Sequence, residues 1–134
     1  MNIELTEKEY RRLLDMVYIG NWVLNSMRGD DRIDDYDDVE SRIFSYCLGH
    51  APALVELDGD AALPSEDFAE GGIHEAIAAY EDTVFYEILA EELARKDMEI
   101  QEIGPENVDE LACRIDEYIE EFEENGMSNV SLNI

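Results

Sequence analysis

The distribution of charge constrains this chain more than any other feature of its sequence. The sequence has 35 Asp and Glu residues against 9 Lys and Arg, which gives a formal net charge of −26 over 134 residues. Residues 43–134 hold 24 of the acids and only 3 of the bases, whereas residues 1–42 hold 11 acids and 6 bases. Such a surface repels nucleic-acid phosphates and anionic membranes. We therefore expect neither direct nucleic-acid binding nor a membrane partner.

The chain nevertheless has enough apolar residues to fold. Hydrophobic residues make up 46% of the sequence, which is more than disordered chains of high charge contain, so the charges must lie on outward faces. The length fits one domain, which we expect to span 1–134. The two cysteines, Cys47 and Cys113, form no CxxC motif, and no signal peptide or apolar stretch of membrane-spanning length is present. These features predict a cytoplasmic protein with free thiols.

Four segments repeat apolar residues with the helical period of 3.6. The first begins at the capping box formed by Thr6 and Glu9 and ends before Gly29. A second helix is predicted over about 36–48, a third over about 73–96, and a fourth from Pro105 to just before Gly126. The apolar positions of the first helix that share one face are Tyr10, Leu13, Val17, Gly20, Leu24 and Met27. The third helix is apolar on two sides, which predicts a central position with neighbours on both.

Three further segments are candidate short strands, and the second and third of them alternate polar and apolar residues. They lie near 53–57, 98–103 and 128–133, and the last two are candidates for pairing with each other. The predicted fold is therefore mostly α, a compact four-helix domain with these short strands.

The fourth helix carries most of its charge on one side. Its candidate acidic face, opposite the apolar arc, consists of Glu110, Glu117, Glu120, Glu121 and Glu124. A solvated face of this kind keeps a protein soluble, but carboxylates spaced along a helix also resemble the phosphates of a nucleic-acid strand. Cys113 falls in the same half, where neighbouring carboxylates disfavour the thiolate that catalysis needs.

A second candidate surface lies on the first helix. Arg11, Tyr18 and Trp22 share a side opposite the main apolar stripe, and these residue types are enriched at binding hot spots. They are candidate partner-binding residues; the alternative is that Trp22 belongs to the core. The same helix is the least acidic part of the chain, so it could also mediate oligomerisation.

The motifs that suggest metal chemistry are incomplete. The acidic run from Asp30 to Asp38 does not match an EF-hand loop. The segment from His74 to Ala78 resembles HExxH but has Ala in place of the second His. Glu87 and Glu91 lie four residues apart without the Glu-x-x-His pattern of di-iron bundles. We expect no metal or other cofactor.

No nucleophile, phosphate-binding or metal-ligand motif is present, so we expect no enzymatic activity. The leading prediction is a protein–protein interaction or regulatory module whose partner carries a basic surface. The first alternative is a nucleic-acid mimic that binds basic DNA- or RNA-binding proteins. The second is a carboxylate-based metal-binding protein.

Overall fold

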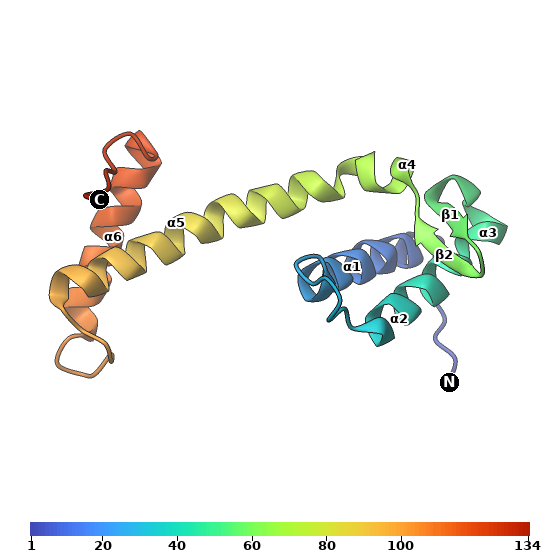
Figure 1. The fold of residues 1–134 in the computed structure, drawn as a ribbon, viewed down its shortest axis with the longest axis horizontal. Coiled ribbons are helices and arrows are strands. Elements are labelled where there is room, and N and C mark those ends of the chain that lie inside the picture. Colours follow the sequence, from blue (N-terminus) through green and yellow to red (C-terminus); the bar gives the residue numbers. More distant parts are fainter. The chain divides into compact units, whose positions relative to one another are not determined.

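The structure, a computed structural model, describes residues 1–134 and is mostly helical (Figure 1). It confirms the four predicted helices, with ends within a few residues of those expected. They are α1 (Glu7–Asn25), α2 (Asp34–Ser45), α5 (His74–Met98) and α6 (Val108–Asn125). The predicted capping box is present at the start of α1, where Thr6 Oγ1 accepts a hydrogen bond from the Glu9 N–H at 3.2 Å.

Short elements connect α2 to α5. In chain order they are α3 (Cys47–His50), the 3₁₀ turn η1 (Pro52–Leu54), β1 (Val55–Asp58), β2 (Ala61–Pro64), α4 (Glu66–Phe68) and the π-helical turn η2 (Ala69–Ile73). The strand predicted near 53–57 is therefore confirmed as β1. Its partner is the segment directly after it, and the two strands form an antiparallel hairpin with Asp58 opposite Ala61.

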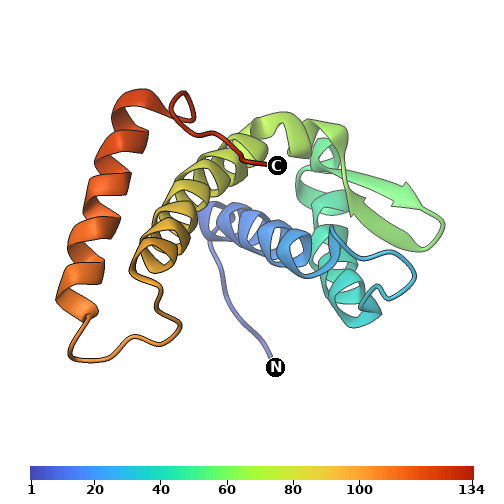
Figure 2. The same cartoon turned by 60° about the vertical axis from the view of Figure 1, so that its left-hand side comes forward.

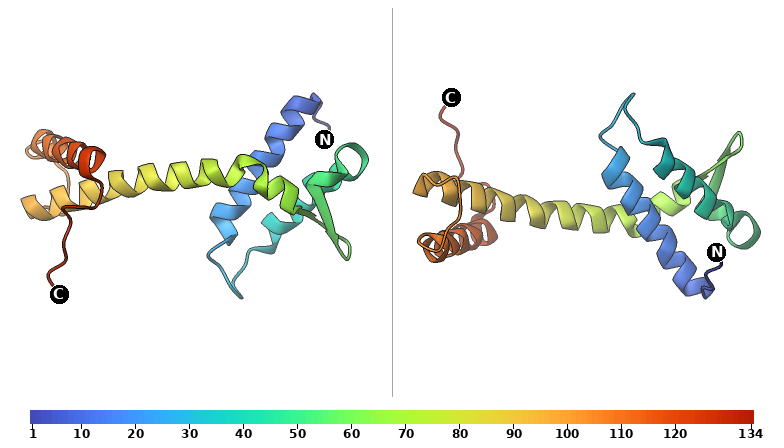
Figure 3. Two further views of the ribbon diagram at one scale, coloured as in Figure 1. Left: turned by 90° about the horizontal axis from the view of Figure 1, so that it is seen from above. Right: turned by 90° about the horizontal axis from the view of Figure 1, so that it is seen from below.

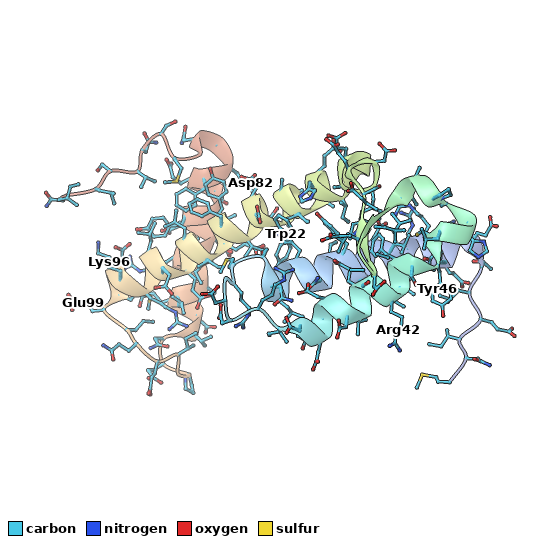
Figure 4. The ribbon with its side chains drawn as sticks, turned by 45° about the vertical axis from the view of Figure 1, so that its right-hand side comes forward. Trp22, Arg42, Tyr46, Asp82, Lys96 and Glu99 are labelled. Carbon is cyan, nitrogen blue, oxygen red and sulfur yellow. The ribbon has the colours of Figure 1, made fainter.

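The strands predicted near 98–103 and 128–133 are wrong. At the end of α5, Glu99 has a φ of 54°, and the N–H groups of Glu99 and Ile100 donate back to the carbonyls of Lys96 and Arg95 at 3.1 Å. This pattern closes a helix with a left-handed residue, so these N–H groups are not available to a strand. Figure 4 labels Lys96 and Glu99 at this helix end. Residues 128–133 are irregular after a turn in which the Val130 N–H donates to the Met127 carbonyl at 3.0 Å.

The chain packs as two compact units, an N-terminal unit (Met1–Ile77) and a C-terminal unit (Ala78–Ile134). The boundary falls within α5, whose first turn belongs to the N-terminal unit. Packing alone does not report whether the two units unfold together, so the single domain expected over 1–134 stays a prediction.

The core of the N-terminal unit forms where α2 packs against both α1 and the hairpin (Figure 2). Phe44 and Phe68 are fully buried, and their rings meet edge to face with centroids 5.0 Å apart. The Ser41 hydroxyl of α2 accepts a hydrogen bond from the Ala62 N–H of β2 at 2.9 Å. The buried residues of this core are Leu14, Phe44, Cys47, Val55, Ala62, Phe68 and Ile73.

Helix α1 is rotated from the orientation that its apolar stripe predicts. Its buried positions are Leu14, Asn21 and Asn25, whereas Leu24 and Met27 of the expected inward stripe are exposed. The inward face thus includes two polar side chains, and apolar side chains remain on the outside of the helix.

The reason for this rotation is a set of hydrogen bonds made by the Asn25 side chain. Its amide donates to the Ile33 carbonyl at 3.0 Å and to Asn21 Oδ1 at 2.8 Å, and its Oδ1 accepts from the Ile33 N–H at 2.8 Å. Asn25 therefore pairs with the backbone of Ile33 much as a neighbouring strand would, which fixes the loop between α1 and α2. A fully buried amide is stable only when paired in this way.

A glycine is required where the chain enters α5. Gly72 lies in η2 with a φ of 110°, a conformation that residues with a side chain rarely adopt. Before it, Ser65 caps α4 by accepting a hydrogen bond from the Phe68 N–H at 3.2 Å. The two features redirect the chain from the hairpin into the long helix.

The C-terminal unit is a hairpin of two helices, in which α6 crosses the C-terminal half of α5 (Figure 1 and Figure 3). Its buried residues are Ala90 and Ala94 of α5 and Leu111 and Phe122 of α6. The rings of Tyr86 and Phe122 meet with centroids 5.3 Å apart. The prediction that α5 packs on both sides is wrong here, since a hairpin of two helices covers only one face of each.

We predict that Asn25→Ala lowers the free energy of unfolding by about 2–3 kcal/mol, because it leaves the N–H and the carbonyl of Ile33 without their partner. Urea unfolding monitored by circular dichroism measures this change. Ser26→Ala is the control, because Ser26 is adjacent and exposed. Equal effects of the two substitutions would contradict the role assigned to Asn25.

We further predict that Glu99→Gly raises the free energy of unfolding by roughly 0.5–1 kcal/mol, because glycine adopts the left-handed conformation without steric cost. Thermal unfolding measures the change. Glu99→Ala removes the same charge but keeps the Cβ, so it should give no comparable gain. A gain from Glu99→Ala as large as that from Glu99→Gly would attribute the effect to charge.

Candidate interaction surfaces

The structure brings Arg11, Tyr18 and Trp22 together on α1 and adds two partners that sequence reasoning had not joined to them. The Tyr18 ring lies between Trp22, with centroids 6.2 Å apart, and Phe68, at 5.3 Å. Its hydroxyl is 2.6 Å from His74 Nε2, and the His74 ring meets Trp22 edge-on at 4.9 Å. An aromatic cluster therefore fills the space between α1, α4 and the first turn of α5.

The polar groups of this cluster are paired within the molecule. The Arg11 guanidinium forms an ion pair with Asp15 at 2.7 Å and lies 4.8 Å from the centroid of Phe68. Burial raises the pKa of Tyr18, and the nearby Glu40 carboxylate adds to the increase. Trp22 remains 37% exposed, so it lies at the edge of the core rather than inside it. A role of these three residues in partner binding stays a prediction.

Beside the cluster lies a partly buried polar network that the sequence analysis missed. Asp37 accepts hydrogen bonds from Asn21 at 2.9 Å and from two nitrogens of Arg32 at 2.6 and 2.7 Å. The hydrogen bonds from Arg32 lower the pKa of Asp37. Two Asn residues four apart, on the face that also contains Leu14, were the signal in the sequence, because Asn is unfavourable inside a helix unless it has a structural partner.

Glu40 is the acid whose charged form this arrangement destabilises. It is 9% exposed, and its pKa is raised, mainly by burial and further by the neighbouring Asp37, while Asn21 and Arg32 partly offset the shift. A buried carboxylate next to an unpaired nucleophile would suggest catalysis. Here the neighbours are an amide, an ion pair and a phenol already bound to His74, so the network serves to connect α1 to α2.

The candidate acidic face of α6 lies on the surface of the C-terminal unit. Glu110, Glu117, Glu120 and Glu124 are exposed, and Glu121 is half-buried. Two of the five have partners: Glu110 pairs with Arg114 at 3.2 Å, and Glu121 accepts hydrogen bonds from Asn125 and Asn129 at 3.1 and 2.6 Å. The other three carboxylates have no ion-pair partner. Cys113 is exposed on the same helix.

The sequence analysis expected both apolar sides of this helix to be covered, but several apolar side chains of α5 are exposed. Tyr80, Phe85 and Ile88 are 68%, 49% and 57% exposed, and Val84 lies half-buried between them. At 100° per residue Phe85 and Ile88 lie on the side of α5 opposite Ala90 and Ala94, whereas Val84 and Tyr80 lie nearer to the buried side. The carboxylates next to them are those of Glu81, Glu87 and Glu92, all exposed and without an ion pair. We call these seven residues the outer α5 surface.

The incomplete metal motifs take ordinary structural roles. Asp31 pairs with Arg28 at 3.0 Å, and Asp34 and Asp35 lie in the first turn of α2, where acids are favoured by the helix dipole. Glu91 pairs with Arg95 at 2.7 Å. The structure contains no group of three or more His, Cys, Asp or Glu side chains arranged to hold a metal ion.

Comparison of the chain with protein-family models, curated proteins and solved structures gave no match. None of its helices combines the length and the apolarity that a membrane span requires.

We predict that Glu40→Gln stabilises the protein at neutral pH. Because the pKa of Glu40 is raised above its ordinary value of 4.5, the native state binds more protons than the unfolded state above that pH. Stability is therefore lost as the pH rises from about 4.5. The neutral amide avoids this loss, so the gain should be full at pH 7 and should disappear below pH 4.5.

Urea unfolding of the two proteins between pH 4 and pH 7 tests this prediction. Glu56→Gln is the matched control, because it removes one charge from an exposed position on β1. If Glu56→Gln gives the same gain, net charge rather than the burial of Glu40 is responsible.

Proposed function

We propose that this chain is a non-enzymatic interaction module whose C-terminal unit binds a basic, amphipathic segment of another protein. The observation that carries the proposal is the outer α5 surface, an exposed apolar stripe at helical spacing in which Glu81 lies one turn before Phe85 and Glu92 lies one turn after Ile88. Such a surface matches a helix that has apolar residues on one face and Lys or Arg beside them. Both cysteines are free thiols, which supports a cytoplasmic location for this interaction.

The apolar part of the surface provides the binding energy. Fully burying an aromatic or a large aliphatic side chain contributes about 1.5–3 kcal/mol, and Phe85 and Ile88 are each about half exposed or more. While these side chains remain in water they do not stabilise the two helices, since helices are stabilised mainly by packing of their apolar faces. A third helix on the outer side of α5 would cover them.

The charge of the unit selects the partner. Residues 78–134 contain 17 acids and 3 bases, a net charge of −14. An acidic partner, including the same unit of a second copy, would be repelled, whereas a basic one would be attracted over a Debye length of roughly 10 Å. The partner is therefore a protein with a basic surface, as the sequence analysis predicted.

A second candidate function rests on a different helix. The unpaired carboxylates of α6, Glu117, Glu120 and Glu124, form an acidic face without an adjacent apolar stripe. This face supports a nucleic-acid mimic that occupies the basic groove of a DNA- or RNA-binding protein. The two candidates differ in their need for Phe85 and Ile88, because a mimic binds through charge alone.

We predict that a synthetic amphipathic helix of Leu and Lys binds the chain and that Phe85→Ser/Ile88→Ser weakens this binding about tenfold or more, because each tenfold loss corresponds to 1.4 kcal/mol. Isothermal titration calorimetry measures the affinity. Leu57→Ser is the control, since Leu57 is 59% exposed on β1. The affinity should fall as the salt concentration rises.

Two results would contradict the proposal. One is the absence of binding at low salt. The other is an affinity that is unchanged by Phe85→Ser/Ile88→Ser but lost in Glu117→Gln/Glu120→Gln/Glu124→Gln, which would favour the nucleic-acid mimic.

A further inference from the structure

A second apolar surface lies on α1, in the N-terminal unit. Met16 and Val23 are 70% and 71% exposed, and Met27, just after the helix, is 95% exposed. With half-buried Leu13 and Gly20 they complete a run spaced three and four residues apart. This surface, which we call the α1 seam, consists of Leu13, Met16, Gly20, Val23 and Met27.

The spacing of the α1 seam is that of a helix which packs lengthwise against another helix. Alternating steps of three and four residues give the a and d positions of a coiled coil. At the N-terminal end the surface continues into a shallow, mainly apolar groove that Leu5 lines together with Leu13 and Met16. The apolar surface therefore extends from Leu13 to the C-terminal end of α1, while Lys8, Glu9 and Arg12 line the groove at its N-terminal end.

Gly20, at the centre of the α1 seam, has no role within the chain. A Cβ placed on it would meet nothing within 4 Å, and its backbone is in the ordinary helical conformation. Glycine in the middle of a helix is unfavourable relative to alanine. A glycine at a helix surface does, however, allow the backbone of another helix to approach closely.

The charge of α1 indicates what covers the seam. Helix α1 contains three acids and three bases and is formally neutral, whereas the other long helices carry net charges of −4 (α2), −5 (α5) and −7 (α6). In a molecule with a net charge of −26, α1 is the helix that can meet its own copy without strong local repulsion. A basic partner finds little to bind here, because Asp15 is paired with Arg11, Glu9 accepts hydrogen bonds from Thr6, and the groove is also lined by the basic residues Lys8 and Arg12.

We propose that two copies of this chain associate through the α1 seam, with the two helices closest at Gly20. The association is driven by burial of Met16, Val23 and Met27, and it is opposed by repulsion between the remaining surfaces of the two copies. This interface is separate from the outer α5 surface, and it does not depend on the function proposed for that surface.

The response to salt distinguishes the two interactions. Salt screens the repulsion between two molecules of like net charge, so self-association through the α1 seam strengthens with increasing salt. Binding of a basic segment to the outer α5 surface weakens under the same conditions. Failure of either interaction can therefore be recognised without reference to the other.

Sedimentation equilibrium of the full chain, over a range of concentrations and at low and moderate salt, tests the proposal. The expected result is a concentration-dependent increase from the monomer mass of 15.3 kDa to twice that value, stronger at moderate salt. Val23→Glu should abolish the increase and leave the circular dichroism spectrum of the monomer unchanged. Leu57→Glu, which adds the same charge at an exposed position on β1, should retain it.

Gly20→Ala distinguishes a role of Gly20 in the interface from a role within the monomer. Alanine should raise the thermal stability of the dilute monomer, because it favours the helix and meets no neighbour, but it should weaken self-association by keeping the two helices apart. The proposal is overturned if the chain remains a monomer under all conditions, if Leu57→Glu acts like Val23→Glu, or if Gly20→Ala strengthens association.

Discussion

The pairing of Asn25 with the backbone of Ile33 determines much of what the N-terminal unit presents to solvent. A fully buried amide must keep its hydrogen bonds, and those of Asn25 are available only when its face of α1 points toward the loop before α2. At 100° per residue, Val23 lies about 160° away from Asn25 around the helix. Burying Asn25 therefore exposes Val23 and, on the same side of α1, Met16 and Met27.

The network around this pair explains how a chain of such high charge can connect its helices. Asp37 receives two hydrogen bonds from Arg32 and one from Asn21, so this acid is held in its charged form by direct partners. Glu40, one turn further along α2, has no such ion pair and is instead buried at the expense of its ionisation. The two acids are thus accommodated in different ways. Hydrogen bonds stabilise the charged form of Asp37, whereas burial raises the pKa of Glu40.

The two units leave apolar surface exposed for different physical reasons. In the N-terminal unit a polar contact rotates α1, whereas in the C-terminal unit two helices are too few to cover both sides of α5. The neighbouring charges also differ, since the α1 seam lies on a neutral helix and the outer α5 surface lies among unpaired carboxylates. This difference in charge, rather than the apolar residues themselves, leads us to assign a second copy to one surface and a basic partner to the other.

The sequence by itself determined the four long helices, because capping residues and the 3.6-residue period are local. It also determined the acidic face of α6, where one apolar arc leaves the other half to solvent. It could not determine which side of α1 is buried, since Asn25 depends on a backbone eight residues away. Nor could the sequence determine how α5 ends. The alternation in Met98–Ile100 resembles a strand, whereas in the structure Glu99 adopts a left-handed conformation that ends the helix. Only the tertiary structure decided that Trp22 lies at the edge of an aromatic cluster. It also decided that one apolar stripe of α5 is uncovered. Each result depends on which other elements pack against the helix concerned.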